Sequence, residues 1–107
     1  ANANVRQSIA QVSTVRNEIT RQVAEALGRY RTAQATVELY ERDILPDANK
    51  SLELGRAVLK AGELDTIRLF QTQRLVFESN LDYIAALQER LSAAALLAGL
   101  LQLDQFP

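Results

Sequence analysis

The first half of the chain carries apolar residues at alternating intervals of four and three. This first seam consists of Val5, Ile9, Val12, Arg16, Ile19, Val23, Ala26, Tyr30, Ala33, Val37, Tyr40 and Ile44. A mean spacing of 3.5 residues keeps one side of a helix against its partner while both helices supercoil. Only Arg16 breaks the apolar rule, so we expect its side chain to reach water or the seam to face water there. The pattern predicts a long helix packed along other helices.

The composition favours an all-α fold with a narrow core. Of the 107 residues, 48% are hydrophobic but only 6% are aromatic, so few large side chains are present to fill a compact globule. Alanine and leucine are abundant, whereas glycine occurs four times and proline twice. Alanine and leucine lose little side-chain freedom in a helix, which gives the chain a high helix propensity. We expect one segment, 1–107, without strands.

The residue types that are absent exclude several functions. The net charge is −1, so there is no basic surface to neutralise nucleic-acid phosphates. The chain has no Cys, His or Met, which removes the usual metal ligands and nucleophile–base pairs. Asp43 and Asp47 stand four residues apart but lack an acid–base partner. We therefore expect no cofactor, no metal and no enzymatic activity, and a helical enzyme domain is the least favoured alternative.

The hydrophobic stretches are too short to predict a membrane span. The longest uncharged run, 91–103, contains thirteen residues, whereas a helix needs roughly 20 to cross a bilayer. We expect no helix of this chain to cross a membrane.

Pro46 interrupts the first helix. Proline lacks an amide proton and crowds the carbonyl four residues earlier, so the helix should kink or restart there. The seam also changes phase by one residue after this point. It continues through Ala48, Leu52, Gly55, Leu59 and Gly62. We interpret this as a local change of phase within one helix; the alternative is that Pro46 opens a second helix.

A turn is predicted near Gly62. Glycine readily adopts the left-handed conformation that ends a helix, and Lys60 lies favourably at the negative end of the helix dipole. Asp65 can cap the free amides of a following helix. We therefore predict a helix over about 4–60, a tip over 61–65 and a second helix over about 66–103, which form a long antiparallel hairpin.

The second helix carries two apolar faces. Its second seam consists of Ile67, Phe70, Arg74, Phe77, Leu81, Ile84, Gln88, Leu91, Ala95 and Ala98. Another face carries Val76, Tyr83, Leu87, Ala94, Leu97 and Leu101. Two apolar faces imply more than one helical neighbour. Folding about Gly62 also leaves residues 1–21 without a partner from this chain, so we expect their partner in another segment or subunit.

Two local ion pairs are predicted on exposed helix faces. Glu25 precedes Arg29 by four residues, and Glu38 precedes Arg42 by the same interval. Such pairs lie side by side on a helix.

The order of these features resembles the TolC-like outer-membrane efflux proteins. The similarity begins with 26–30 (ALGRY), Tyr40, 44–46 (ILP) and 59–62 (LKAG). It continues with 69–73 (LFQTQ), 83–87 (YIAAL) and the leucine-rich 96–99. In this family, three subunits form a β-barrel in the outer membrane and a helical barrel across the periplasm. The resemblance implies that this chain is one periplasmic hairpin of such a trimer, which reaches the membrane only through other segments.

The resemblance also implies a passive role for the tip. Family tips form the periplasmic mouth of a conduit for drugs or metal ions and meet the adaptor protein and inner-membrane transporter. The matching residues here are Lys60, Ala61, Gly62, Glu63, Leu64 and Asp65. Some members carry an Asp six residues after the tip glycine, at the gate, whereas this chain has Arg68. The nearest acidic residues are Glu63 and Asp65.

A second interpretation is a coiled-coil interaction module, such as the adaptor hairpin of the same pumps. Adaptor tips tend to carry an Arg followed by Leu four residues later, and no Arg in this chain has a Leu at that interval. We therefore favour the channel hairpin. Because surfaces meant for neighbouring subunits would be exposed, we expect the isolated segment to self-associate. The sequence leaves open whether drugs or metal ions are transported and which hairpin of the subunit this is.

Overall fold

The computed structural model describes the backbone of residues 2–62 and 66–105 and the side chains of these residues up to Leu103. The chain forms α1 (Asn2–Leu39), the π-helix η1 (Tyr40–Ile44), α2 (Leu45–Lys60) and α3 (Thr66–Gln105). Since no strand occurs among the described residues, the predicted all-α class is confirmed.

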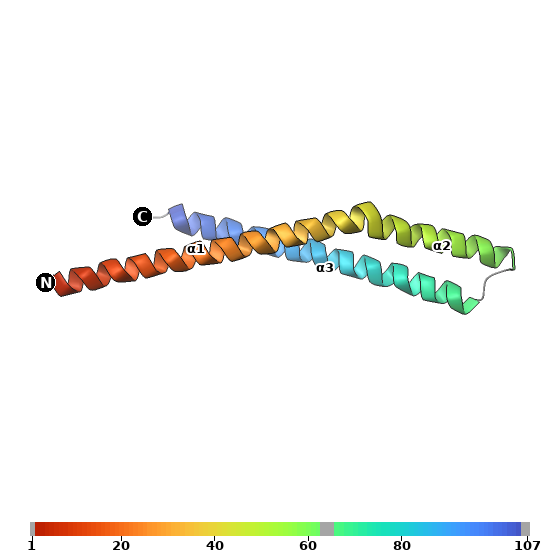
Figure 1. Ribbon diagram of the computed structural model, residues 1–107, viewed down its shortest axis with the longest axis horizontal. Helices are drawn as coiled ribbons and strands as arrows, with labels where there is room; N and C mark the ends of the chain where they lie inside the picture. Colours follow the sequence, from red (N-terminus) through yellow and green to blue (C-terminus); the bar gives the residue numbers. More distant parts are fainter. Residues whose placement is uncertain (1, 63–65, 106–107) are drawn as a thin grey trace.

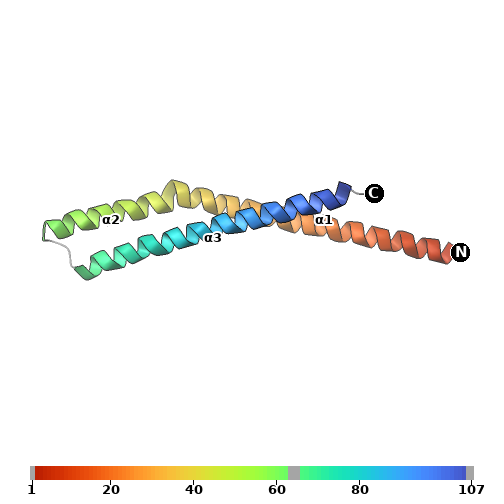
Figure 2. The same cartoon turned by 180° about the vertical axis from the view of Figure 1, so that it is seen from behind.

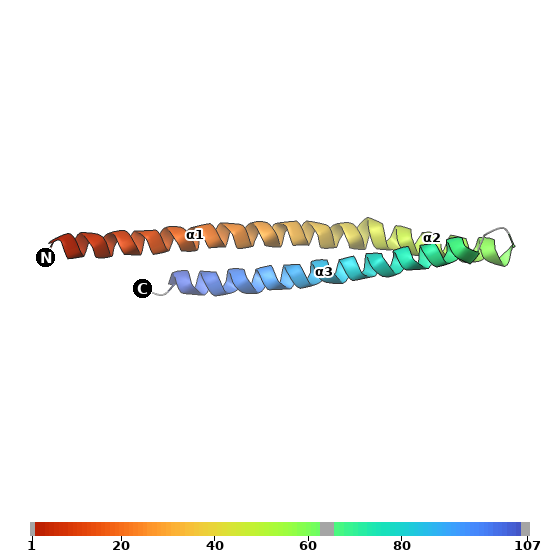
Figure 3. The same ribbon diagram turned by 90° about the horizontal axis from the view of Figure 1, so that it is seen from below.

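The molecule is a thin rod with extents of 88 × 20 × 14 Å. α1, η1 and α2 follow one another end to end, and α3 returns beside them (Figure 1 and, from behind, Figure 2). α3 crosses α1 in Figure 1 and α2 in Figure 3, so the two rods wind around each other. This arrangement is consistent with the predicted antiparallel hairpin.

The first seam faces α3 from Ile19 onward, as predicted. Ala26, Ala33 and Val37 are buried, and Ala48 continues the buried line in α2. Val37 is the largest of the described side chains that are fully buried. The core is therefore a narrow line of small residues, as the low aromatic content indicated.

α3 packs through a different face from the second seam. Its buried residues are Leu69, Ser79, Ala86, Ala93 and Leu100, whereas every residue of the second seam is exposed. Of the two apolar faces predicted for α3, the second seam therefore points away from α1 and α2, whereas most of the other face, including Tyr83 and Leu87, is half-buried. Small residues at intervals of seven on both helices let the axes approach closely, which the large side chains of the second seam would prevent.

The N-terminal part of α1 extends beyond the end of α3, as Figure 3 shows. Residues 2–18 are all exposed, including Val5, Ile9 and Val12. At a rise of about 1.5 Å per residue, this unpaired part is roughly 25 Å long. This part lacks a partner among the described residues, as predicted, but burial begins at Ile19, before the predicted limit at residue 21; Arg16 lies where the seam faces water.

The change of phase before Pro46 has a structural cause. In η1 the Leu45 amide donates to the Tyr40 carbonyl, five residues earlier, which accommodates one extra residue in the turn. Ile44 and Leu45 retain right-handed helical dihedral angles, so the chain bends here (Figure 1) without ending the helix. Pro46 then lies in the first turn of α2, so the bend coincides with both a π-turn and a proline, which are two known causes of helix kinks. The predicted kink with a one-residue phase change is confirmed.

By length and composition, α3 meets the criteria for a membrane-spanning helix, which the sequence analysis did not expect of any helix. Its segment Thr66–Leu103 is long enough to cross a membrane and contains an apolar 18-residue window with at most two charged residues. The expectation relied on the longest uncharged run and so missed this window. One such helix is weak evidence for a span, because a packed helix in a soluble protein meets the same criterion.

The burial of Val37 predicts a large difference between two valine-to-alanine substitutions. Val37→Ala should lower the free energy of unfolding by about 1–3 kcal/mol, since it removes buried methyl groups and leaves a cavity. Val12→Ala, at an exposed position, should change it by less than about 0.5 kcal/mol. Both changes alter helix propensity equally, so urea denaturation at one fixed protein concentration isolates the effect of burial. Equal effects would contradict the assignment of the seam.

The π-turn predicts a position-dependent effect of deleting one residue. Deletion of Asp43 should convert η1 into ordinary α-helix while α2 keeps its phase, because the π-turn holds one extra residue, so the free energy of unfolding should fall by less than about 1 kcal/mol. Deletion of Ala85, in the middle of α3 and away from any π-turn, should rotate one half of α3 by about 100° and lower the free energy of unfolding by about 2–4 kcal/mol in the same denaturation experiment. If both deletions had the same cost, η1 would not hold the extra residue.

Candidate interaction surfaces

α2 ends at the part of the tip that the structure describes. The Ala61 amide donates to the Ala57 carbonyl at 3.1 Å, and the Gly62 amide donates to the Leu59 carbonyl at 2.9 Å. Gly62 has a φ of 81°, in the left-handed region that side chains disfavour. A Cβ at this position would meet no atom within 4 Å, so glycine is required for its backbone conformation and not for packing within the chain.

The structure describes only part of the predicted tip. Lys60, Ala61 and Gly62 are exposed, whereas Glu63, Leu64 and Asp65 lie outside the described residues. Arg68 is exposed on the first turn of α3. The exposed backbone and cations of the described tip form a surface that another protein can reach.

A groove of about 500 Å³ lies behind the tip, between α2 and α3. Its lining includes Leu54, Gly55 and Val58 from α2 and Arg68 and Leu75 from α3. Leu54 and Leu75 are more than half exposed, so the groove offers apolar surface to a partner. The sequence analysis missed these two leucines because they lie beside the seams; Leu54 follows the seam residue Leu52 by two positions.

Polar side chains connect α3 to the middle of the opposite rod. The Tyr83 hydroxyl donates to Glu41 Oε1 at 2.6 Å, and its ring centroid lies 6.5 Å from that of Tyr40. Farther from the tip, Arg90 Nη1 donates to the side-chain oxygen of Gln34 at 2.8 Å. These contacts fix the lengthwise position of α3, which agrees with the register predicted from folding about Gly62.

An ion pair between the helices replaces one of the predicted local pairs. Arg29 Nε lies 2.8 Å from Glu89 Oε1, while Glu25 pairs with Arg21. The guanidinium of Arg29 lowers the pKa of Glu89, and the carboxylate raises the pKa of Arg29. The predicted Glu25–Arg29 pair is therefore wrong, because Arg29 lies within reach of α3.

The second predicted local pair is also wrong. Arg42 contacts Asp43 with an Nε–Oδ2 distance of 3.3 Å, whereas Glu38 accepts a hydrogen bond from Gln34. Both contacts lie on exposed surface, where ion pairs contribute little to stability. They are features of a solvated face.

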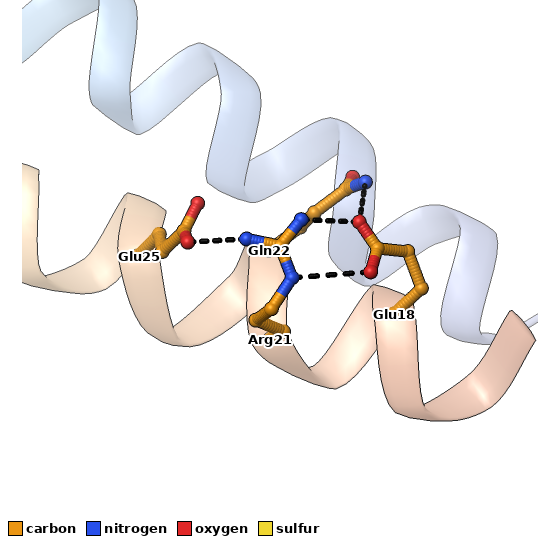
Figure 4. A network of polar contacts seen from close by, with 4 residues as sticks. All are labelled: Glu18, Arg21, Gln22 and Glu25. Atoms are coloured by element: carbon orange, nitrogen blue, oxygen red, sulfur yellow. Dashed lines mark hydrogen bonds and ion pairs between the residues drawn. The ribbon is translucent and has the colours of Figure 1, made fainter. Parts of the chain in front are cut away.

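A local network lies where α1 passes the end of α3 (Figure 4). Arg21 pairs with both Glu18 and Glu25, and Gln22 donates to Glu18 at 3.1 Å. The hydrogen bonds from Arg21 and Gln22 lower the pKa of Glu18 to about 2 from an ordinary value of 4.5. Its contribution to helix stability is therefore present above about pH 4.5 and is lost as the pH falls toward 2. The network supports α1 at the point where its pairing with α3 begins.

The described residues do not bring together three or more His, Cys, Asp or Glu side chains that could hold a metal ion. Asp43 and Asp47, the carboxylates considered in the sequence, are both exposed. The surfaces with evident chemical character are therefore the tip, the groove behind it and the exposed second seam.

No protein-family model, curated protein sequence or solved structure matches this chain.

The Tyr83–Glu41 hydrogen bond predicts a specific change in tyrosine titration. This bond to a carboxylate raises the pKa of Tyr83, so its stabilising effect is complete below about pH 10 and is lost as the pH rises further. Glu41→Gln should move the pKa of Tyr83 back toward its ordinary value, as measured by tyrosinate absorbance. Tyr83→Phe identifies the signal of this residue, and Glu38→Gln serves as the exposed control. An unchanged titration in Glu41→Gln would contradict the contact.

Proposed function

We propose that this chain is a periplasmic helical hairpin of a trimeric outer-membrane efflux channel. In this proposal the chain is a passive wall element for the passage of drugs or metal ions. Its tip docks to a periplasmic adaptor and an inner-membrane transporter. The proposal includes the antiparallel hairpin, the periplasmic location and the TolC-like relationship implied by the sequence resemblance.

The observation that carries the proposal is the apolar surface left uncovered on α3. Phe70, Phe77 and Leu91 are each more than 60% exposed, although they follow the same spacing as the packed seam. A helix in the wall of a barrel has a neighbour on each of two sides, so it requires apolar residues on two faces. α3 meets this requirement with its buried face and its exposed second seam.

The unpaired part of α1 supports the same proposal. Val5, Ile9 and Val12 continue the first seam beyond the end of α3 and are exposed. Apolar residues at helix-packing intervals favour a helical neighbour over solvent. In a barrel of several hairpins, that neighbour would come from another hairpin.

The residues at the tip favour the docking of a partner protein over a catalytic role. Gly62 leaves its backbone uncovered, and Lys60 and Arg68 are exposed on either side of the turn. Because a glycine has no side chain, a partner can approach the backbone closely. The groove with Leu54 and Leu75 adds apolar contact surface directly behind the tip.

The channel role is tested by export from the bacterium that carries the parent gene. Disruption of that gene should raise the cellular accumulation of a fluorescent drug or of a toxic metal ion, and the intact gene should restore export. Gly62→Val should reduce export severalfold, because a β-branched residue is strained at this φ and alters the tip. Gly28→Ala is the matched control, since its added Cβ meets no atom within 4 Å.

Two results would overturn the proposal in different ways. Unchanged accumulation of both substrate classes after gene disruption would exclude the channel role. Normal export by Gly62→Val, with normal protein levels in the envelope, would exclude the tip as the docking surface. The parent reading frame gives a further check, since β-strand repeats and a second hairpin of similar pattern should accompany this segment.

A further inference from the structure

The exposed face of α3 has the length and character of a helix-pairing surface. Its large members, here called the outer stripe, are Phe70, Phe77, Leu81, Ile84 and Leu91, which are 49–72% exposed. They follow one another at intervals of three, four and seven residues, so they lie along one line on the helix. This line runs nearly opposite the buried face of α3.

The outer stripe presents enough surface for a specific interface. Side chains of this size carry roughly 150–200 Å² each, so at the observed exposures the five present about 440–590 Å². Ala95, Ala98 and the stems of neighbouring polar residues extend this area. Stable interfaces bury about 600–1,000 Å² on each partner, so pairing along the whole stripe reaches the lower end of that range.

A matching surface exists on a second copy of α3. The sides of α1 and α2 that point away from α3 carry exposed charged residues, including Arg21, Arg42 and Lys50. Burying these charged side chains would be costly, even where a carboxylate on the same helix pairs with them. The outer stripe of another α3, in contrast, is apolar over the same length.

Side-chain size along the exposed seam of α3 favours antiparallel pairing. Phe70 and Phe77 lie toward the tip, while Ala95 and Ala98 lie toward the other end of the exposed seam. Antiparallel pairing places the large residues of one copy near the small residues of the other, which allows close packing along the pair.

We propose that two copies of this chain associate through their outer stripes, with the two α3 helices antiparallel and crossing near Leu81 and Ile84. The pair directs its two tips to opposite ends. The pair uses the same stripe that a neighbouring helix would cover in a barrel, where all tips point the same way. It therefore describes this chain outside an assembled barrel, and it rests on the apolar face of α3 rather than on the channel role.

Sedimentation equilibrium of the 107-residue chain tests the association. The unaltered chain should form dimers, and the double variant Phe77→Asp with Ile84→Asp should raise the dissociation constant by at least tenfold. Ile9→Asp places the same charge on an exposed apolar residue of α1 and should leave the dimer intact. Circular dichroism of each variant verifies that the helices remain formed. A strictly monomeric unaltered chain, or a dimer broken only by Ile9→Asp, would overturn the proposal.

Disulfide formation between added cysteines tests the orientation without disrupting the stripe centre. The natural chain has no cysteine, so each added thiol is unique. A mixture of Phe70→Cys and Ala95→Cys chains should form the mixed disulfide under mild oxidation, and neither variant should efficiently form a disulfide with itself. Efficient self-linking of Phe70→Cys would indicate a parallel pair and would overturn the proposal. Failure of the export experiment, in contrast, would leave both of these measurements unaffected.

Discussion

The close approach of α1 and α3 is the constraint on which the other features of the molecule depend. Ala26 and Ala33 on one helix face a side of α3 that contains Ala86 and Ala93. Small side chains bring the helix axes near each other but bury little apolar area per residue. The larger residues of α3 are consequently placed on its other faces, where this chain alone does not cover them. The exposed second seam is thus a result of how the buried seam is built.

The polar contacts complement this narrow core. Alanine surfaces are smooth and repeat every seven residues, so they specify the lengthwise position of two helices weakly. Tyr83, Arg90 and Glu89 each form a hydrogen bond with one residue of α1 or η1, and shifting α3 by one turn would separate all three pairs. The alanines therefore set the distance between the helices, and the polar side chains set their register.

Sequence spacing could predict much of the fold. The first seam from Ile19 to Ile44, the phase change before Pro46 and the turn at Gly62 each leave a local pattern in the chain. The inner face of α3 could not be identified in this way, because both of its faces are apolar and the exposed one carries the larger residues. Hydrophobicity favours Phe70 and Phe77, whereas close packing selects Ser79 and Ala86.

The candidate surfaces were only partly predictable for similar reasons. Gly62 and Lys60 could be placed at a tip, but the groove beside Leu54 requires two helices to be positioned together. Intervals of four residues also suggested that Arg29 pairs with Glu25, although its actual partner is sixty positions away in the sequence. Local spacing cannot distinguish between partners that compete across the fold.

The π-turn at η1 has an evolutionary consequence. Along two paired helices, the gain or loss of one residue normally rotates every later side chain by about 100° and removes it from the interface. A π-turn contains such an extra residue within a single turn while the helix continues on both sides. Among homologous chains that keep this pairing, a one-residue gap is therefore tolerated best between Tyr40 and Leu45. The presence or absence of that gap would distinguish lineages that acquired the extra residue from those that retain an uninterrupted helix.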